Sequence, residues 1–328
     1  MRVALTALLA FAAGVLLMLA LHPVAPRHAA ASARPAVAAS APAPAPEEAD
    51  EDEPDDAWPD DAPTPEQVIY AQPRLLKSAL AHLTPRVPGR PNLYLLAFAG
   101  DGAEDVFRNE AEYAARLFVE RFGPTAHALV LENNPATLDR RPLANWSNLE
   151  AALDALPATM DPAQDILVLY LTSHGGEDHS LLVDMDPLPL DQIGAQDLGD
   201  ILRRRPFKWK VVVVNACYAG GFVPELRGPG TLVLTAARAD RSSFGCGSDS
   251  DITYFGRAWL VDALNRTDDL IAAFRQAQGE IAQWERKDRF QPSEPQIDIG
   301  EGIADKLAQW RKGVPQGTAV PFAPASNN

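Results

Sequence analysis

Continuous apolar segments alternate along most of the chain with segments in which apolar residues recur every three or four positions. The continuous segments lie within residues 92–100, 126–134, 165–176, 208–221 and 230–240. The helical spacing is found in residues 67–83, 106–122, 145–156, 195–205, 252–264 and 267–287. Strands that are apolar throughout are typical of parallel sheets covered by helices on both faces. The pattern predicts an α/β fold, a three-layer sandwich with a mostly parallel central sheet, and residues 296–300 fit an edge strand.

The first 22 residues carry a longer apolar run. After Arg2, nineteen residues from Val3 to Leu21 contain no charge. As a helix they would span about 28 Å, close to the thickness of a bilayer's hydrocarbon core. Residues 1–22 are therefore predicted to be a signal anchor, or a signal peptide cut at a small-residue site such as Ala31–Ala33. The run is longer than the usual signal-peptide core, which favours the anchor.

The charges that flank this run predict its orientation. Arg2 precedes it, and basic residues favour the cytoplasmic side, although Arg27 and Arg34 on the other flank weaken the bias. We expect a single-pass protein of the inner membrane whose C-terminal domain lies in the periplasm. If the signal is cleaved, the same domain is expected to be exported to the periplasm.

Residues 23–65 are predicted to be a disordered tether. They are first rich in Ala and Pro, and then carry ten acidic and no basic residues between Glu47 and Asp61. Neither composition can bury a core, so a spacer is a better interpretation than a recognition motif. The remaining residues, 66–328, are enough for one large domain.

Composition excludes several classes of function. The chain has a formal net charge of −15, whereas a nucleic-acid-binding protein needs a basic face. Two cysteines and six histidines occur without the spacing of a metal site. Because glycine-rich nucleotide-binding patterns are also absent from the sequence, we predict no metal and no cofactor.

Two predicted strands end in residues with nucleophilic or basic side chains. His174 and Gly175 follow the third strand, and Cys217 follows the fourth. Consecutive strands are usually neighbours, so His174 and Cys217 are expected side by side at one edge of the sheet. An imidazole there can take the thiol proton and later protonate a leaving amine. The N–H groups of Gly175 and Cys217 could stabilise an oxyanion. Each residue alone is more often structural, as a buried thiol or a loop histidine, but the pair favours catalysis.

With these residues in place, the sequence resembles the caspase-like cysteine peptidases, and most closely the legumain-like peptidase family C13. The resemblance is to a bacterial-type member that is membrane-anchored or exported. The resemblance rests on five segments that occur in order between residues 93 and 260: LYLLAFAGDG, VFRNEAEYAARLF, LVLYLTSHGG, KVVVVNACYAGGF and TLVLTAARADRSSFGCGSDSDITYFGRAW. The resemblance implies a caspase-like fold for residues 66–328. It also implies Cys217 as nucleophile, His174 as its base, and Gly175 and Cys217 as the backbone donors to the oxyanion.

The resemblance also implies a substrate pocket. Arg108 matches the arginine of the family's primary specificity pocket. Ser242 and Ser243 are expected either to line the same pocket or to belong to a polar loop. Asn215 and Arg257 stand where legumains carry two acids that recognise asparagine. A pocket with Arg108, Asn215 and Arg257 favours a carboxylate, so we expect an acidic residue before the scissile bond, with asparagine as the alternative.

Three functions remain open at this point. The first is a cysteine endopeptidase that acts on peptide or protein substrates. The second is a transpeptidase or transamidase, in which an amine takes the acyl group from Cys217. The third is an inactive caspase-like module that binds a partner. Cys246 lies in the loop after the fifth strand, and is either a structural thiol or a disulfide partner that would silence Cys217.

Overall fold

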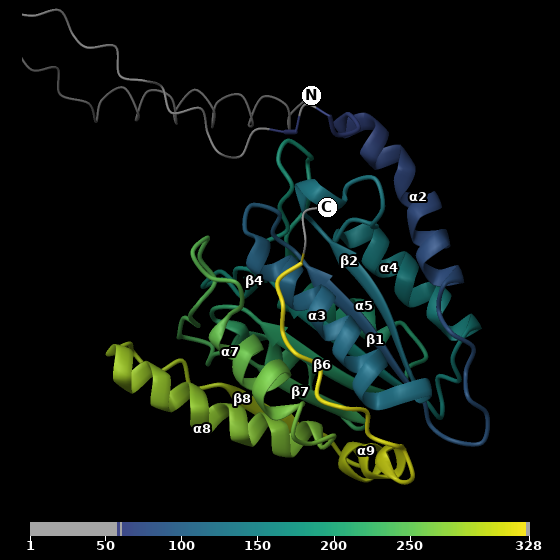
Figure 1. The fold of residues 1–328 in the computed structure, drawn as a ribbon, viewed down its shortest axis with the longest axis vertical. Coiled ribbons are helices and arrows are strands. Elements are labelled where there is room, and N and C mark those ends of the chain that lie inside the picture. Colours follow the sequence, from purple (N-terminus) through teal and green to yellow (C-terminus); the bar gives the residue numbers. More distant parts are fainter. Residues whose placement is uncertain (1–57, 60, 326–328) are drawn as a thin grey trace, which may run out of the picture. The chain divides into compact units, whose positions relative to one another are not determined.

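Six strands form one central sheet in the computed structural model, which describes residues 58–59 and 61–325 (Figure 1). The strands stand in the order β2-β1-β3-β6-β7-β8, and every neighbouring pair is parallel except β7 and β8. Their bounds are Leu93–Ala99 (β1), Ala126–Glu132 (β2), Ile166–Thr172 (β3), Trp209–Asn215 (β6), Thr231–Thr235 (β7) and Gln296–Ile299 (β8). The predicted strands, including the edge strand, are confirmed; the antiparallel direction of β8 was not predicted.

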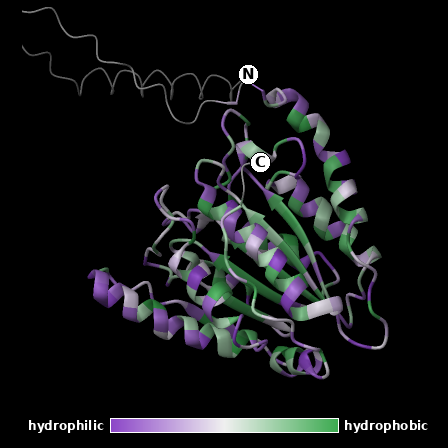
Figure 2. Ribbon diagram, viewed as in Figure 1, coloured by the Kyte–Doolittle hydropathy of each residue, from purple (hydrophilic) through white to green (hydrophobic). Residues whose placement is uncertain are grey.

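Alternation of side chains along each strand creates two apolar cores, one on each face of the sheet. In β6, Val211 and Val213 face one core, and Val212 and Val214 face the other. All four are fully buried, which explains why the run is apolar at every position. Figure 2 shows the same pattern, with hydrophobic strands inside and hydrophilic residues on the outer sides of the helices.

Helices cover both faces, as the pattern predicted. The first core receives α3 (Asp105–Phe122), the π-helix η5 (Arg257–Ala263), α8 (Leu270–Asp288) and α9 (Ile303–Arg311). The second receives α2 (Pro65–Ala81), α4 (Trp146–Ala155), α5 (Ala195–Arg203) and α6 (Val223–Leu226). The remaining short helical segments are η1 (Gly123–Thr125), η2 (Pro135–Thr137), η3 (Leu156–Ala158), η4 (Ala219–Phe222) and α7 (Tyr254–Gly256). The α/β three-layer class is therefore confirmed.

Side-chain caps define the starts of two helices. Asn145 accepts a hydrogen bond from the Asn148 N–H at 2.8 Å, as expected of an N-cap. Thr64 and Gln67 form a capping box at the start of α2. Before that helix, Trp58 packs against the small core around Val68, and its ring N–H donates to the Pro63 carbonyl at 3.0 Å. The other predicted tether residues up to 57, and the signal segment 1–22, lie outside the described residues.

The pattern did not predict two features of the described chain. A two-stranded sheet, β4 (Ser180–Leu181) with β5 (Ile193–Gly194), returns the chain after β3. Beyond α9, the C-terminal segment runs back past α3 (yellow in Figure 1), where the Val320 carbonyl accepts from the Tyr113 hydroxyl at 2.8 Å. This segment therefore stabilises the helix that follows β1.

Within residues 58–59 and 61–325, no helix is both long and apolar enough to cross a bilayer.

Candidate active site

The ends of β3 and β6 bring His174 and Cys217 to equivalent positions. The two strands are parallel neighbours, and Thr172 stands opposite Asn215 in the register. His174 and Cys217 each follow two residues later, at the carboxyl edge of the sheet. In open α/β sheets this edge is where ligands bind.

A returning segment holds the loop that carries His174. The His174 carbonyl accepts from the Leu182 N–H at 3.0 Å, and the Ser173 hydroxyl donates to the Leu182 carbonyl at 2.6 Å. Gly175 forms an isolated bridge with Leu181. These bonds fix the backbone on both sides of the imidazole, so the ring is anchored even though it lies outside regular structure.

Two carboxylates lie against the His174 ring. Its Nε2 is 3.2 Å from Glu104 Oε2 and 3.6 Å from Asp101 Oδ2. Phe107 packs edge-on to the ring, with the ring centroids 5.1 Å apart. Burial, aided by a hydrogen bond with Glu104, raises the pKa of Asp101 to about 6. Since both acids address Nε2, the proton exchanged with a substrate or thiol is left to Nδ1.

The Cys217 thiol lies among donors that favour the thiolate. Its Sγ accepts from the Ser243 N–H at 3.2 Å. A hydrogen bond from the Cys246 side chain, helped by Ser243 and by nearby His174, lowers the pKa of Cys217 to about 5. The same bond and burial raise the pKa of Cys246. Cys217 is the partner that ionises, because the Ser243 amide donates to it; both cysteines are free in the structure.

A sharp turn follows the nucleophile candidate. Tyr218 has a φ of 56°, which is unfavourable for a bulky side chain by about 1–3 kcal/mol. Its N–H donates to the Arg241 carbonyl at 2.7 Å, and its hydroxyl donates to Glu177 at 3.3 Å. These bonds hold the strained residue, so the chain leaves the strand abruptly and Cys217 stays partly exposed.

Gly175 is required by a close approach of two backbones. A Cβ on this residue would collide with the carbonyl oxygen of Cys217. Among the described residues, the N–H groups of Gly175 and Cys217 donate no hydrogen bond. Two free backbone donors therefore lie beside the thiol.

Asn215 is buried in a network centred on Glu110 of α3. The Glu110 carboxylate accepts from Asn215 Nδ2 at 2.6 Å and from the Thr253 N–H at 2.8 Å. The hydroxyls of Tyr170, Thr172 and Thr253 donate to it as well. Glu110 is fully buried, and burial raises its pKa. The network ties α3 to β3, β6 and α7 beneath the two strand ends.

The other predicted pocket residues have separate surroundings. Arg108 is 1% exposed, and its guanidinium donates to Asn134 at 3.2 Å and lies within 4 Å of Asp105 and Glu112. Arg257 is half-exposed and pairs with Asp262 on its own helix at 3.3 Å. Arg108, Asn215 and Arg257 thus have different partners.

The two predicted pocket serines lie on the loop after β7. The Ser243 backbone touches the Cys217 sulfur, and Ser242 beside it is exposed. Of the predicted substrate-binding residues, Ser243 is therefore the one in direct contact with the thiol.

One group of side chains in the described part of the chain could hold a metal ion. Ligand atoms of Asp101, Glu104 and His174 lie within 4.8 Å of one another. They already pair as a histidine with two carboxylates, an arrangement that orients an imidazole without an ion.

Three acidic residues of the site, Asp101, Glu104 and Glu110, were not predicted from the sequence. Asp101 directly follows β1 and Gly100, so the argument applied to His174 and Cys217 would have found it. Only His and Cys residues at strand ends were taken as candidates, so Asp101 was not predicted. Glu104 and Glu110 belong to the start of α3, and no sequence pattern distinguishes them from the other acids there.

Comparisons with known proteins bear on the same residues. The family model described as the Peptidase C13 family matches residues 149–306, slightly under half of the chain. The matched range contains His174 and Cys217 and leaves out Arg108. A crystal structure of caspase-1 from Spodoptera frugiperda is similar to this chain with a TM-score of 0.43 and 12% identity, over 65% of this chain and 87% of that one. No curated protein matches the chain. The family match supports a function of the cysteine peptidase type.

Proposed function

We propose that this protein is a cysteine endopeptidase that cleaves peptide bonds with Cys217 and His174. The observation that carries the proposal is the parallel register of β3 and β6, which sets the two residues at equivalent strand ends. The Peptidase C13 match over the same strands supports it.

The geometry suggests how the first half of the reaction would proceed. The Cys217 thiolate attacks the substrate carbonyl, and the carbonyl oxygen becomes negatively charged. The N–H groups of Gly175 and Cys217 are available to stabilise this oxyanion. His174 then donates a proton from Nδ1 to the leaving amine, which departs and leaves a thioester on Cys217.

Glu104 and Asp101 are positioning residues in this scheme. Their contacts at Nε2 fix the orientation of the imidazole, so that Nδ1 is the nitrogen left to deliver the proton to the leaving amine. In the second half, His174 accepts a proton from water, and the resulting hydroxide attacks the thioester to release the acid. Cys217 is thereby returned to the thiolate.

The transferase alternative shares every step up to the thioester. It differs only in that an amine, rather than water, takes the acyl group. We favour hydrolysis because the partly exposed thiol lies where water can reach it. An inactive binding module is disfavoured by the low pKa of Cys217, which a mere scaffold would not need.

An acidic residue before the scissile bond stays a prediction from Arg108, Asn215 and Arg257. Arg108 and Asn215 are buried in the structure, so an acidic substrate would have to reach Arg108 in competition with Asp105 and Glu112. We also propose that residues 1–22 tether or export the domain to the periplasmic side of the inner membrane. Fractionation of cells, with mass spectrometry of the N-terminus, distinguishes an anchored chain from a cleaved one.

The test of the proposed function is a fluorogenic peptide library offered to the full chain under mild reductant. Cleavage is expected in the parent protein and is expected to vanish in Cys217→Ala and in His174→Ala. Arg204→Ala serves as the control, because that side chain is 69% exposed on α5. Labelling of Cys217 by iodoacetamide without any cleavage, with or without added amines, would contradict a peptidase.

A further inference from the structure

The outer edge of the sheet at β2 is open. β2 is the last strand on its side of the sheet, and within the described residues no strand pairs with its outer edge. An edge strand presents the backbone N–H and C=O groups that its neighbour does not use. Near its end, the Glu132 N–H is taken by the Pro142 carbonyl at 3.0 Å. At its start, the Ala126 N–H is taken by the Gly123 carbonyl. The outward-facing backbone groups between these two ends of the seven-residue strand, which is about 23 Å long, are left for a further strand.

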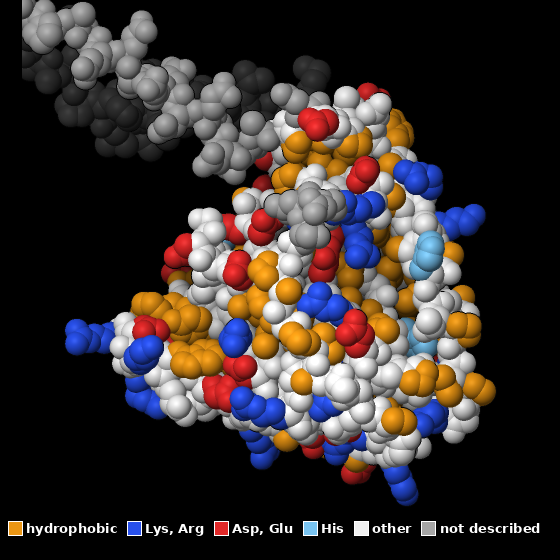
Figure 3. Space-filling model, viewed as in Figure 1, with side chains coloured by type: hydrophobic (Ala, Val, Ile, Leu, Met, Phe, Trp, Pro, Cys, Tyr) orange, Lys and Arg blue, Asp and Glu red, His pale blue; other side chains and the backbone are white. Residues whose placement is uncertain are grey.

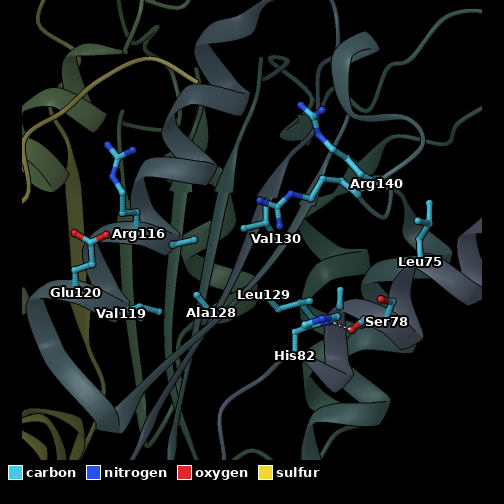
Figure 4. A pocket seen from close by; sticks show the side chains of 13 residues that line it. Leu75, Ser78, His82, Arg116, Val119, Glu120, Ala128, Leu129, Val130 and Arg140 are labelled. Atoms are coloured by element: carbon cyan, nitrogen blue, oxygen red, sulfur yellow. Dashed lines mark hydrogen bonds between the residues drawn. The ribbon is translucent and has the colours of Figure 1, made fainter. Parts of the chain in front are cut away.

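A groove of about 430 Å³ runs along this edge between two helices. Figure 4 shows its construction, with Arg116 and Glu120 of α3 on one side, Leu75 and His82 of α2 on the other, and β2 between them.

The groove has an apolar floor that water reaches. Val119 is 44% exposed, and Ala115 and Ala128 beside it are partly exposed. Figure 3 shows the same face, where hydrophobic side chains lie in a recess between α2 and α3 below a group of basic ones. Small and branched apolar side chains next to an open strand edge suit the alternate side chains of an added strand.

The rim of the groove is basic. Arg116, Arg140 and Arg141 line it, against one carboxylate in the lining, that of Glu120. Arg141 also faces inward, with its Nε 3.6 Å from the buried Glu132. Arg116 donates to the Pro321 carbonyl at 3.2 Å, and because a carbonyl is uncharged this bond does not neutralise the guanidinium. The rim therefore favours a negatively charged ligand, although the protein as a whole is acidic.

We propose that this groove binds an extended, acidic segment of a partner protein, which adds to β2 as a seventh strand. The open edge supplies backbone hydrogen bonds, Val119 and its neighbours receive one set of alternate side chains, and the arginines pair with the acids. β1 stands between β2 and β3, so this surface is separate from the His174 loop. The proposal holds whether or not the chain is a peptidase.

The experiment measures binding of two fluorescent nine-residue peptides to the full chain carrying Cys217→Ala. In one peptide Asp alternates with Val, and in the other Lys replaces Asp. We expect the acidic peptide to bind, more weakly as salt is added, and the basic peptide not to bind. The double variant Arg116→Ala/Arg140→Ala and the single variant Val119→Asp should each weaken binding about tenfold. Hydrogen exchange should show new protection of the outward-facing amides of Ala128 and Val130.

Control variants show whether a change in peptide affinity comes from the groove. Arg204→Ala removes an arginine that is 69% exposed on α5, and it should leave the affinity unchanged. An equal loss in Arg204→Ala, or full affinity in Val119→Asp, overturns the proposal, as does absence of binding at low salt. In a further variant, the ten acids between Glu47 and Asp61 are replaced by their amides. Binding that appears only in this variant would mean that the chain's own acidic run competes for the groove, and would overturn a partner as its occupant.

Discussion

Glu104 Oε2 lies 3.2 Å from Nε2 of His174, on the side of the ring that Asp101 also contacts. The two acids come from the loop after β1 and the residue that precedes α3, so three consecutive strands of the sheet, β1, β3 and β6, each contribute to the site. The proposed catalytic pair of His174 and Cys217 is thus joined by two carboxylates that hold the imidazole.

Removing the Glu104 charge should slow turnover without unfolding the protein. In Glu104→Gln a neutral amide replaces the carboxylate that contacts Nε2, so the imidazole is held less firmly and kcat/KM should fall about 10- to 100-fold. Peptidase assays between pH 5 and pH 8 measure this. Glu120→Gln, an exposed change on the same helix, should leave kcat/KM unchanged. A rise in KM with an unchanged kcat would show that Glu104 acts on substrate binding instead.

Cys246 should control the ionisation of Cys217. Its hydrogen bond is the largest cause of the lowered pKa of about 5, so Cys246→Ala should move that pKa upward toward the ordinary value of 9.0. The rate of Cys217 alkylation by iodoacetamide, followed by mass spectrometry from pH 4 to pH 9, reports the shift. If the midpoints of the parent and the variant coincide, Ser243 and His174 alone set the pKa.

Gly175 should tolerate no side chain. In Gly175→Ala the new Cβ meets the Cys217 carbonyl, which displaces the two backbone donors beside the thiol. Activity should fall about 100- to 1,000-fold, the usual effect of losing an oxyanion donor. Gly279→Ala is the matched control, since a Cβ there meets nothing within 4 Å. In the middle of α8 it should raise the free energy of unfolding by about 0.5–1 kcal/mol.

Glu110 should make stability depend on pH. Its pKa is raised by burial, so the folded chain keeps this proton at a pH where the unfolded chain, near 4.5, has lost it. The stabilisation is complete below pH 4.5 and is lost as the pH rises through the folded pKa. Urea titrations of Glu110→Gln at several pH values from 4 to 8 should therefore show a smaller decline than the parent.

Deleting the Glu110 side chain separates that effect from the network itself. Glu110→Ala leaves the hydroxyls of Tyr170, Thr172 and Thr253 without the carboxylate that accepts from them, and should cost about 3–5 kcal/mol. A cost below about 1 kcal/mol would show that water replaces the carboxylate.

The fold could be predicted largely from the sequence because its strands are apolar at every position. A run such as Val211–Val214 has one physical explanation, burial on both faces, and strand order then places His174 near Cys217. The partners of Arg108 could not be predicted, because Asn134 follows another strand and meets it only in the folded chain. The short β4–β5 pair was missed for a similar reason, since two residues a strand leave no periodicity.

The number of valines before Asn215 also determines how far along β6 the Cys217 thiol lies. Each residue of a strand advances the chain by about 3.3 Å and reverses the face of its side chain. Substitution among Val, Ile and Leu would change little in these positions. Deletion of one valine would move the Cys217 thiol one residue along the strand, away from the imidazole of His174. It would also turn the side chains on one side of the deletion to the opposite core. In related sequences, the number of residues in this strand should therefore vary less than their identity, and insertions should gather in the loops beyond it.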